Sequence, residues 1–338
     1  MELLEKYSLS QLNTFHIEAK SKYFAEVSTT IDTQEASLFA KRNNLPVLIL
    51  GGGSNILFTK DFEGIIIKPS KTGINIIDEN KKQIFLEVSA GEKWDDVVHY
   101  AIERNYFGIE NLVAIPGNAG AAPIQNIGAY GVELKDSFFS LKGFNIASEK
   151  WVELNKDECD FNYRQSIFKT ELKDIFIIDS FILQLSKVPN PKLEYANIKE
   201  YFNNLKWESL TAQEIAVVIK KIRESKLPNP KILGNAGSFF KNPIISRDKF
   251  NQLKLINTDI PNFIAGINEV KIPAGWLIEK CGFKGKRTGN VGTYEKQSLI
   301  LVNYGNAMGN EILQFAELIK SKVELKFGIQ LEYEVNIK

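Results

Sequence analysis

The stretch VLILGGGSN, residues 47–55, joins an apolar run to a glycine triplet, and a second apolar run, GIIIK, follows at residues 64–68. Short apolar runs bounded by turn residues are typical of buried strands, so the segment predicts a strand, a glycine loop and another strand. Glycine allows backbone N–H groups to gather around an anion. The loop therefore either cradles a diphosphate or makes a tight structural turn, and by itself it favours neither.

The glycine loop lacks the features of the two common nucleotide-binding motifs. A P-loop has Gly-Lys-Ser or Gly-Lys-Thr before a helix, whereas Gly53 is followed by Ser54, Asn55 and a predicted strand. The dinucleotide fingerprint of the Rossmann fold also needs a helix directly after its glycines, because the helix dipole faces the phosphates. The pattern excludes both motifs.

Helix and strand patterns alternate on either side of the loop. Asp32 and Glu35 have the spacing of a capping box and predict the start of a helix that ends near Asn43. Thr211 and Glu214 have the same spacing before a second amphipathic helix. Other periodic runs predict a helix at residues 94–102, a long helix from residue 312 that is capped by Gly328, and strands at residues 85–89, 176–185 and 329–337. The chain is therefore expected to be α+β, with mixed sheets.

Composition and charge restrict the classes of partner. The 338 residues carry 42 basic and 41 acidic side chains, a formal net charge of +1. This balance gives no long-range field that would collect nucleic acid or an anionic membrane, so an anionic ligand must be held by local groups. No apolar run has the length of a membrane span, and the first residues, MELLEK, do not resemble a signal peptide. A cytoplasmic protein that binds neither nucleic acid nor membrane is expected.

The two cysteines and the length complete this first description. Cys159 and Cys281 are far apart and have no CxxC partners, which predicts reduced thiols and no metal site. A chain of 338 residues exceeds one ordinary domain. The segment KLPNP, residues 226–230, would end the helix before it and is the expected domain boundary.

A second loop, residues 115–131 with the sequence IPGNAGAAPIQNIGAYG, is long and lacks periodicity. Long ordered loops in compact domains are often functional, and small residues allow a ligand to approach the backbone. The adjacent amides of Gln125 and Asn126 offer donors and acceptors to a planar heterocycle. A purely structural loop would not ordinarily need both amides, so the pair favours a ligand.

Five blocks in order along the chain resemble the UDP-N-acetylenolpyruvoylglucosamine reductase family of the vanillyl-alcohol-oxidase-type flavoproteins. Each block alone is common, whereas the ordered set covers the chain from about residue 13 to its end. The insertion around Tyr195 resembles the larger of the two family types. The blocks are LGGGSN at residues 50–55, IPG at 115–117 with IQNIGAYG at 124–131, YRQSIF at 163–168, GNAGSFFKN at 234–242 and LEYEV at 331–335.

The resemblance implies a fold, a cofactor and a reaction. The fold would be α+β with three domains: a first FAD-binding subdomain at residues 1–70 completed by the strand 329–338, a second at 71–226, and a substrate-binding domain at 227–328. Non-covalent FAD would take hydride from NADPH and deliver it from flavin N5 to the enolpyruvyl methylene of a UDP-sugar, giving UDP-N-acetylmuramate for peptidoglycan. A monomeric cytoplasmic enzyme is expected, with this small molecule as its partner.

The resemblance also assigns residues to roles. Arg164 would clamp the substrate carboxylate, Ser238 would donate the proton and Glu334 would stabilise the developing charge. The substrate-binding positions would be Tyr163, Tyr195, Lys226, Asn242 and Gln297. The cofactor-binding positions would be Gly51, Gly52, Gly53, Ser54, Asn55, Pro116, Gly117, Gln125, Asn126, Gly128, Ala129, Tyr130 and Arg223.

Plainer interpretations exist for each of these residues. An isolated Arg164 would more often form a salt bridge, Ser238 could cap a helix or lie in a turn, and Lys226 could simply be solvated. Glu332 lies on the same face of the predicted last strand as Glu334 and competes for its role. At the level of the whole protein, a regulatory protein that binds a flavin or UDP-sugar and a flavin oxidase are the two alternatives to a reductase.

Overall fold

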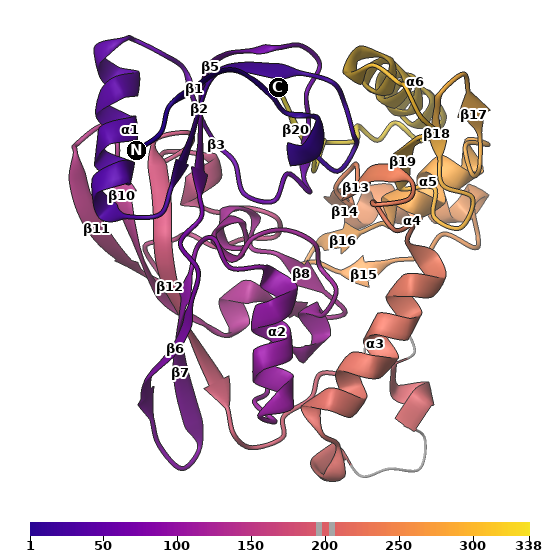
Figure 1. The fold of residues 1–338 in the computed structure, drawn as a ribbon. Coiled ribbons are helices and arrows are strands. Elements are labelled where there is room, and N and C mark those ends of the chain that lie inside the picture. Colours follow the sequence, from indigo (N-terminus) through magenta and orange to yellow (C-terminus); the bar gives the residue numbers. More distant parts are fainter. Residues whose placement is uncertain (194–197, 203–206) are drawn as a thin grey trace. The chain divides into compact units, whose positions relative to one another are not determined.

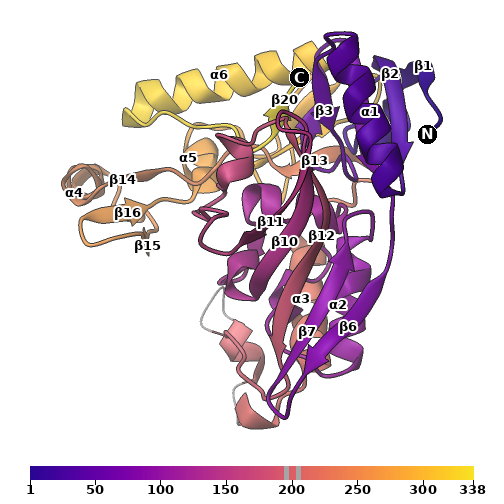
Figure 2. The same ribbon diagram turned by 90° about the vertical axis from the view of Figure 1, so that its left-hand side faces the viewer.

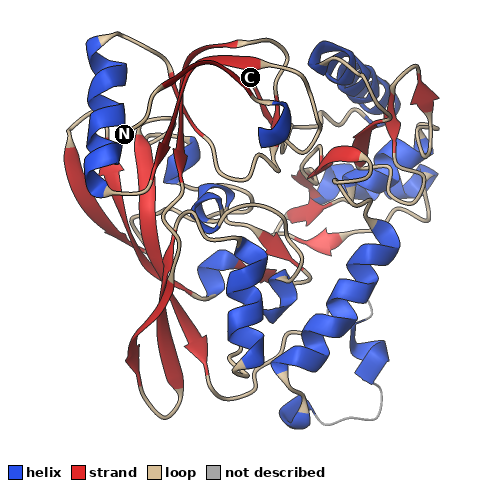
Figure 3. Cartoon of the chain, viewed as in Figure 1, coloured by secondary structure: helices blue, strands red, loops and turns tan. Residues whose placement is uncertain are grey.

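The fold is described from a computed structural model, which describes residues 1–193, 198–202 and 207–338 (Figures 1 and 3). The chain forms two compact units, each assembled from separate segments. Unit 1 contains Met1–Tyr7, Ser21–Gly53 and Phe62–Ser225, and unit 2 contains Ser8–Lys20, Ser54–Asp61 and Lys226–Lys338. The division falls within the glycine loop, between Gly53 and Ser54.

The first sheet of unit 1 contains both strands that flank the glycine loop, which confirms the strands predicted there. Its central strand β5 is parallel to β2 and β3, and Ile65, Ile66 and Ile67 on it are fully buried. Burial on both faces is typical of a parallel strand and explains the continuous apolar run. The strand order is β1 (Leu4–Ser8), β2 (Lys20–Val27), β5 (Phe62–Pro69) and β3 (Val47–Ile49).

Helix α1 (Thr30–Arg42) packs Ala36 and Ala40 against this sheet. The capping box predicted from Asp32 and Glu35 is wrong by three residues, because Thr29 is the N-cap and Asp32 its partner. The Asp32 backbone N–H donates to Thr29 Oγ1 at 3.1 Å, and the Thr29 N–H donates to the Asp32 carboxylate at 3.1 Å. Thr29 has the extended backbone that an N-cap requires, so the helix begins one turn earlier than the acidic pair suggests.

The second sheet of unit 1 has five strands, and every strand pairing in it is antiparallel. Apolar side chains from one of its faces share a core with α2 (Trp94–Glu103) and α3 (Ala212–Lys226), which lie on the same side of the sheet (Figure 2). These elements confirm the predicted helix at residues 94–102 and the capping box of Thr211 and Glu214. The strand order is β11 (Lys150–Asn155), β10 (Phe138–Asn145), β12 (Phe176–Ser186), β7 (Gln83–Ser89) and β6 (Ile74–Glu79).

Short elements connect the sheet to the loops of unit 1. The loop 115–131 contains two single turns of 3-10 helix and ends in a small hairpin of β8 (Gly128–Ala129) and β9 (Val132–Glu133). The two turns in the loop are Ala119–Ala121 and Pro123–Gln125. The other 3-10 turns of this unit are Glu110–Leu112, Leu134–Asp136, Ile167–Lys169, Ile198–Phe202 and Trp207–Ser209.

Unit 2 is built around a four-stranded sheet that α6 (Gly309–Phe327) covers with Ile312, Phe315 and Ala316. Gly328 ends this helix in the left-handed conformation, as predicted. The sheet order is β13 (Gly234–Ser238), β19 (Ile300–Asn303), β18 (Val291–Thr293) and β17 (Arg287–Thr288). The other elements are the 3-10 turn Ser10–Leu12, β4 (Ile56–Leu57), β14 (Ile244–Ser246), α4 (Arg247–Ile256), β15 (Phe263–Ile264), β16 (Glu269–Lys271), α5 (Ala274–Lys280) and β20 (Asn336–Ile337).

The predicted last strand is wrong in extent, since only β20 at its end is regular strand. The segment changes partner along its length. Lys241 N–H donates to the Glu332 carbonyl at 2.9 Å, whereas Asn336 N–H donates to Asn55 at 3.1 Å and β20 pairs in parallel with β4. The chain bends at Glu334 and Val335 to make this change, which interrupts the ladder although apolar and polar residues still alternate.

Two further observations apply to the described part of the chain. None of its helices is both long and apolar enough to cross a lipid bilayer. Among the same residues, no group of three His, Cys, Asp or Glu side chains lies close enough to bind a metal ion.

Candidate functional site

The two glycine-rich loops touch within unit 1. A Cβ atom added to Gly52 would lie 2.8 Å from Gly117 Cα and 2.9 Å from Asn118 Oδ1, closer than real Cβ atoms approach. Glycine is therefore required at Gly52 by the close approach of another backbone, not by an unusual φ angle. The two glycine-rich loops quoted from the sequence therefore contact each other through backbone atoms.

The second loop is held against the turn between β7 and α2. Three backbone bonds fix it: Trp94 N–H donates to the Gly117 carbonyl at 3.0 Å, Ala119 N–H to Glu92 at 2.7 Å, and Gly120 N–H to Ala90 at 2.9 Å. A Cβ on Gly120 would meet Ala90 Cβ at 2.6 Å, so this contact also needs a glycine. The loop is consequently ordered without regular secondary structure of its own.

Four non-glycine residues with left-handed backbone lie on or beside these loops in unit 1. Their φ angles are +59° at Ala114, +44° at Asn126, +50° at Tyr130 and +54° at Arg164. Such residues each cost of order 1 kcal/mol and persist where surrounding contacts hold them, often at functional sites. At Ala114 two side chains hold the left-handed backbone in place. The Ala114 N–H donates to Asp95 at 2.6 Å, and its carbonyl accepts from Arg223 at 3.3 Å.

Asn126 is fully buried, and protein groups occupy its side chain. Its amide donates to the Glu133 carboxylate at 3.0 Å and to the Asn162 carbonyl at 3.1 Å, and its Oδ1 accepts from Lys135 N–H at 3.0 Å. Both donors and the acceptor are therefore committed inside unit 1. Asn126 can meet a heterocycle only through its backbone, whereas the neighbouring Gln125 side chain is partly exposed.

Arg164 lies at a tight turn that places it beside the loop 115–131. Asn162 and Gln165 exchange backbone hydrogen bonds of 3.0 and 3.1 Å across this turn. The guanidinium Nη2 then donates to the Gly128 carbonyl at 2.7 Å. Tyr163 is partly exposed on the same turn, and its ring centroid lies 5.7 Å from the Arg164 guanidinium carbon.

Arg223 on α3 adds a second guanidinium to this part of unit 1. Burial is the main reason that its pKa is lowered, and the positive charge of Arg164 contributes in the same direction, while Tyr130 and Asp95 oppose the shift. Its Nε is buried and has no hydrogen-bond partner among the described residues, which also place no carboxylate within ion-pair distance of it. A partly buried cation beside loop backbone and a second arginine is an arrangement suited to an anion or an electron-rich ring.

In unit 2, Ser238 is the last residue of β13 and is partly exposed. The strand bulges just before it, since the pairing with β19 shifts register between Asn235 and Ser238, and Gly237 has a φ of +69°. The Asn235 side chain stabilises this bulge by accepting from Gly237 N–H at 3.0 Å. Bulges redirect side chains, and they are frequent beside active sites. The plainer interpretations of Ser238 as a helix cap or turn serine do not describe its position.

Glu334 lies at the bend of the carboxyl-terminal segment, next to Ser238 in the same unit. Its N–H donates to the Phe239 carbonyl at 2.9 Å, and its carbonyl accepts from the Asn55 amide at 3.2 Å. The competing Glu332 side chain is 75% exposed and pairs with Lys241 at 2.9 Å. Glu334 is partly buried, so the structure separates the environments of the two carboxylates.

Two of the expected substrate contacts meet at the start of α5 in unit 2. Asn242 Oδ1 accepts from Ala274 N–H at 2.9 Å, and a Cβ on Gly275 would lie 2.7 Å from Gln297 Oε1. Lys226 is exposed at the end of α3, and Tyr195 lies outside the described residues.

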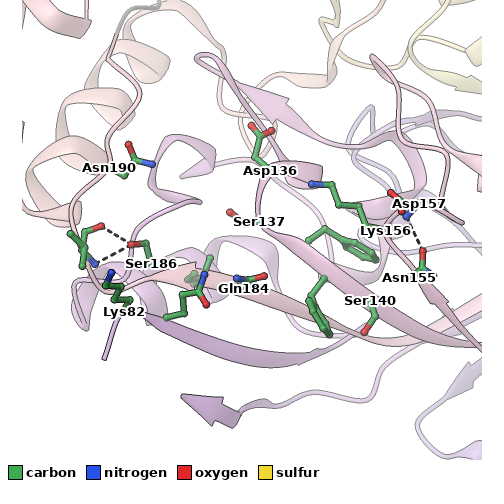
Figure 4. A pocket seen from close by; sticks show the side chains of 15 residues that line it. Lys82, Asp136, Ser137, Ser140, Asn155, Lys156, Asp157, Gln184, Ser186 and Asn190 are labelled. Atoms are coloured by element: carbon green, nitrogen blue, oxygen red, sulfur yellow. Dashed lines mark hydrogen bonds between the residues drawn. The ribbon is translucent and has the colours of Figure 1, made fainter. Parts of the chain in front are cut away.

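The structure thus groups the expected residues into two sets. In unit 1 it gathers Gly51, Gly52, Gly53, Pro116, Gly117, Gln125, Asn126, Gly128, Ala129, Tyr130, Tyr163, Arg164 and Arg223. In unit 2 it gathers Ser54, Asn55, Lys226, Ser238, Asn242, Gln297 and Glu334. A pocket of about 810 Å³ on the five-stranded sheet contains neither set, and is lined by polar residues such as Lys82, Ser137, Lys156 and Gln184 (Figure 4).

Sequence reasoning missed the residues that hold the loops. Asp95 fixes the strained Ala114, Asn118 donates to the Gly91 carbonyl at 2.6 Å, and the buried Ser166 hydroxyl donates to the Ile124 carbonyl at 2.6 Å. Asn118 and Ser166 lie in or next to the five sequence blocks quoted above, and this position could have indicated their role. Asp95 carried only the weak signal of an acidic residue in the first turn of a helix.

Two family models match different parts of the chain. Residues 21–155 match a family described as an FAD binding domain, and residues 229–338 match the C-terminal domain of UDP-N-acetylenolpyruvoylglucosamine reductase. The chain is 44% identical over 340 residues to the UDP-N-acetylenolpyruvoylglucosamine reductase of Flavobacterium johnsoniae, with all of both chains covered. It is 40% identical over 337 residues to the Pseudomonas aeruginosa protein of the same name, covering 100% of this chain and 99% of the relative.

A solved structure shows the same fold. The crystal structure of UDP-N-acetylenolpyruvylglucosamine reductase from Thermus caldophilus matches with a TM-score of 0.68 at 19% identity, over 99% of this chain and 98% of that one.

Proposed function

Given that the chain belongs to the UDP-N-acetylenolpyruvoylglucosamine reductase family and is an oxidoreductase, we propose that it uses NADPH and FAD to reduce the enolpyruvyl ether of UDP-N-acetylglucosamine to UDP-N-acetylmuramate. The observation that carries this proposal is the convergence of Arg164 and the partly buried Arg223 on one stretch of loop backbone, where they donate to the carbonyls of Gly128 and Ala114. Ala114 and the nearby Tyr130 both have left-handed backbone. The two cations fit an electron-rich ring system and a carboxylate together.

The residues of unit 1 fit a bound FAD. Close contact between Gly52 and Gly117 leaves backbone where a side chain would otherwise stand, and Arg223 offers a buried Nε donor. The holding residues would be those assigned from the sequence, with Asn126 acting through its backbone. When bound, FAD would supply the hydride, received from NADPH, that reduces the alkene. The two histidines, His16 and His99, lie outside the glycine loops, which is consistent with non-covalent binding.

The chain's own residues would manage the charge and the proton of the reaction. Hydride addition to the enolpyruvyl methylene leaves negative charge on the adjacent carbon and its carboxylate. Arg164 would hold that carboxylate, and the planar guanidinium suits a two-bond clamp. The Ser238 hydroxyl would donate a proton to the carbon, since a carbanion-like centre needs only a well-placed weak acid. Glu334, protonated at that moment, would stabilise the carboxylate charge.

The remaining assignments follow the same proposal. The residues that would contact the UDP-sugar are Tyr163, Tyr195, Lys226, Asn242 and Gln297. Asn242 and Gln297 would act from positions beside the start of α5. We also keep the proposed domains 1–70 with 329–338, 71–226 and 227–328, a monomeric state and a cytoplasmic location.

The test is a comparison of three outcomes with the purified protein. A reductase should be yellow, should bleach anaerobically with NADPH and should recover its colour only when the enolpyruvyl UDP-sugar is added. A flavin oxidase would recover rapidly with oxygen, and a binding protein would not turn over. A colourless protein that does not bind added FAD would contradict the proposal.

A further inference from the structure

The turn that carries Arg164 is attached to the loop 124–128 by three hydrogen bonds. Arg164 itself donates to Gly128, and the Asn126 amide donates to the Asn162 carbonyl. The third bond runs from the Ser166 hydroxyl to the Ile124 carbonyl and is 2.6 Å long. The three bonds join alternate residues of the turn, 162, 164 and 166, to alternate residues of the loop.

Among the three turn residues 162, 164 and 166, Ser166 is the one whose side chain is fully buried. No ligand role is assigned to it. Its hydroxyl also accepts from Phe168 N–H at 3.3 Å, which caps the 3-10 turn Ile167–Lys169. One oxygen therefore donates to the loop and accepts from the turn, and both of its bonds are inside unit 1. Without that hydroxyl the Ile124 carbonyl, which belongs to a partly buried residue, would lose its donor.

The backbone of Arg164 gives this bond a mechanical role. Its φ of +54° is strained for a non-glycine residue, so the turn keeps this conformation only while its neighbours hold it. Ser166 lies two residues after Arg164 and anchors the carboxyl-terminal arm of the turn, while Asn126 anchors the amino-terminal arm at Asn162. The guanidinium points in one direction because both arms are fixed.

We propose that Ser166 is a positioning residue for Arg164, whose hydroxyl holds the guanidinium in the direction needed to clamp the substrate carboxylate. This inference rests on the proposed function of Arg164. It assigns to Ser166 no contact with substrate or cofactor. Its effect should fall on the step that uses the carboxylate clamp and spare the step that does not.

The experiment compares Ser166→Ala with Ser137→Ala in the FAD-loaded protein. Ser137 is a matched control, since it is also buried in unit 1 and donates its hydroxyl to a backbone carbonyl, that of Gly108, at 3.0 Å. Stopped-flow absorbance measures flavin reduction by NADPH and reoxidation by the enolpyruvyl UDP-sugar separately. Ser166→Ala should slow reoxidation about tenfold or more, because small misplacements of a catalytic group have effects of this size, and change reduction less than about twofold. Ser137→Ala should leave both rates within about twofold of wild type.

A double-mutant cycle separates positioning from general destabilisation. In an Arg164→Lys background, Ser166→Ala should add little further loss of the reoxidation rate, because the oriented guanidinium is already gone. Hydrogen exchange gives a second readout that needs no activity. The amides of Asn162 and Gln165 should exchange faster in Ser166→Ala than in Ser137→Ala, with and without FAD.

Each outcome has a defined meaning. Fully additive losses in the cycle, equal reoxidation rates in the two serine variants, or unchanged exchange at Asn162 and Gln165 would overturn the role of Ser166. If Ser166→Ala does not fold, Ser166→Cys, with its weaker donor, takes its place, and a wild-type reoxidation rate in that variant would likewise overturn it. A wild-type protein that fails to bind FAD or to be reoxidised by the sugar would instead contradict the proposed function.

Discussion

The backbone N–H of Glu334 donates to the carbonyl oxygen of Phe239 over 2.9 Å, which ties the proposed carboxylate to the residue that follows Ser238. Two segments separated by almost a hundred residues thus present their side chains from one backbone framework in unit 2. The bond uses only main-chain atoms, so replacing either side chain leaves it in place. Substitutions at Ser238 and Glu334 can therefore test chemistry with little disturbance of the fold.

Ser238→Ala should slow reoxidation of the reduced enzyme by the enolpyruvyl sugar about 10²–10⁴-fold, the range expected for loss of a proton donor. Reduction by NADPH should remain nearly normal because no proton from Ser238 is needed there. Stopped-flow measurement of both half-reactions checks this. Ser321→Ala, which removes an exposed hydroxyl on α6, is the control and should change neither rate. Equal slowing of both half-reactions by Ser238→Ala would refute the assignment.

Glu334→Gln should also slow reoxidation, by a smaller factor of about 10–100, because the amide can still donate one hydrogen bond to the carboxylate. Glu332→Gln is the matched control two residues away, where the carboxylate is 75% exposed and pairs only with Lys241. Its removal should leave reoxidation within about twofold of wild type, as expected for an exposed ion pair. A larger loss at Glu332 than at Glu334 would reverse the two roles.

Arg223→Lys should weaken FAD binding about tenfold or more. The arginine guanidinium reaches the Ala114 carbonyl with Nη2 and keeps Nε as a further donor, and the single ammonium group of lysine cannot do both. Fluorescence quenching during titration of the flavin-free protein measures the dissociation constant. Arg104→Lys, at the exposed arginine that follows α2, supplies the control and should bind FAD like the wild type. Identical affinities for the two variants would remove Arg223 from the site.

Gly52→Ala should lower both stability and FAD affinity, because its methyl group would lie 2.8 Å from Gly117 Cα, a backbone atom that cannot move aside easily. Overpacking of this kind typically costs about 1–3 kcal/mol. Thermal unfolding with and without FAD tests it. Gly266→Ala is the comparison, since the nearest atom there is the flexible Glu269 carboxylate at 3.2 Å, and its melting temperature should hardly change.

Asp32→Asn should reveal a pH-dependent part of the stability of α1. The Thr29 hydroxyl is the main cause that lowers the Asp32 pKa from 3.8 to about 2. A carboxylate with a depressed pKa stabilises the fold above its unfolded pKa, and this contribution is lost as the pH falls through the folded pKa. The difference in unfolding free energy between wild type and variant should be constant from pH 7 to 5 and should shrink below pH 4.

Urea unfolding at several pH values measures this difference. Thr29→Ala should reduce the same pH-dependent contribution, because it removes the hydroxyl that lowers the pKa. A difference between wild type and Asp32→Asn that stays constant from pH 5 to 3 would show that Asp32 does not act in this way.

Local sequence patterns predicted the elements whose burial is regular. The strand β5 was found because it contains a continuous apolar run, and the helix α2 was found because its apolar residues repeat with the period of a helix. The strands β10 and β11 were missed, because β10 contains two register shifts, near Phe138 and near Gly143, that break the alternation of the pattern. The sequence did not predict the bend at Glu334, because apolar and polar residues continue to alternate through it. The backbone nevertheless changes its hydrogen-bonding partner there.

The motifs predicted which residues to consider but not what their side chains do. Asn126 has the right chemistry for a ligand, yet three protein groups already use that chemistry. Only the three-dimensional arrangement shows that Arg223 lies partly buried near Arg164, because the two residues are on separate elements. The assignment of Ser8–Lys20 and Ser54–Asp61 to unit 2 was also invisible locally, since it depends on contacts with residues after 226.

That segmented composition of unit 2 has a consequence for how the protein is made. The ribosome releases residues 8–20 and 54–61 long before it translates their neighbours, among them Asn235, which donates to the Thr14 carbonyl, and β20, which pairs with β4. The nascent chain must carry these two stretches without their final contacts while more than 160 further residues are added. Unit 1 can begin to fold during synthesis, whereas unit 2 must wait until the segment from Lys226 to Lys338 has been made.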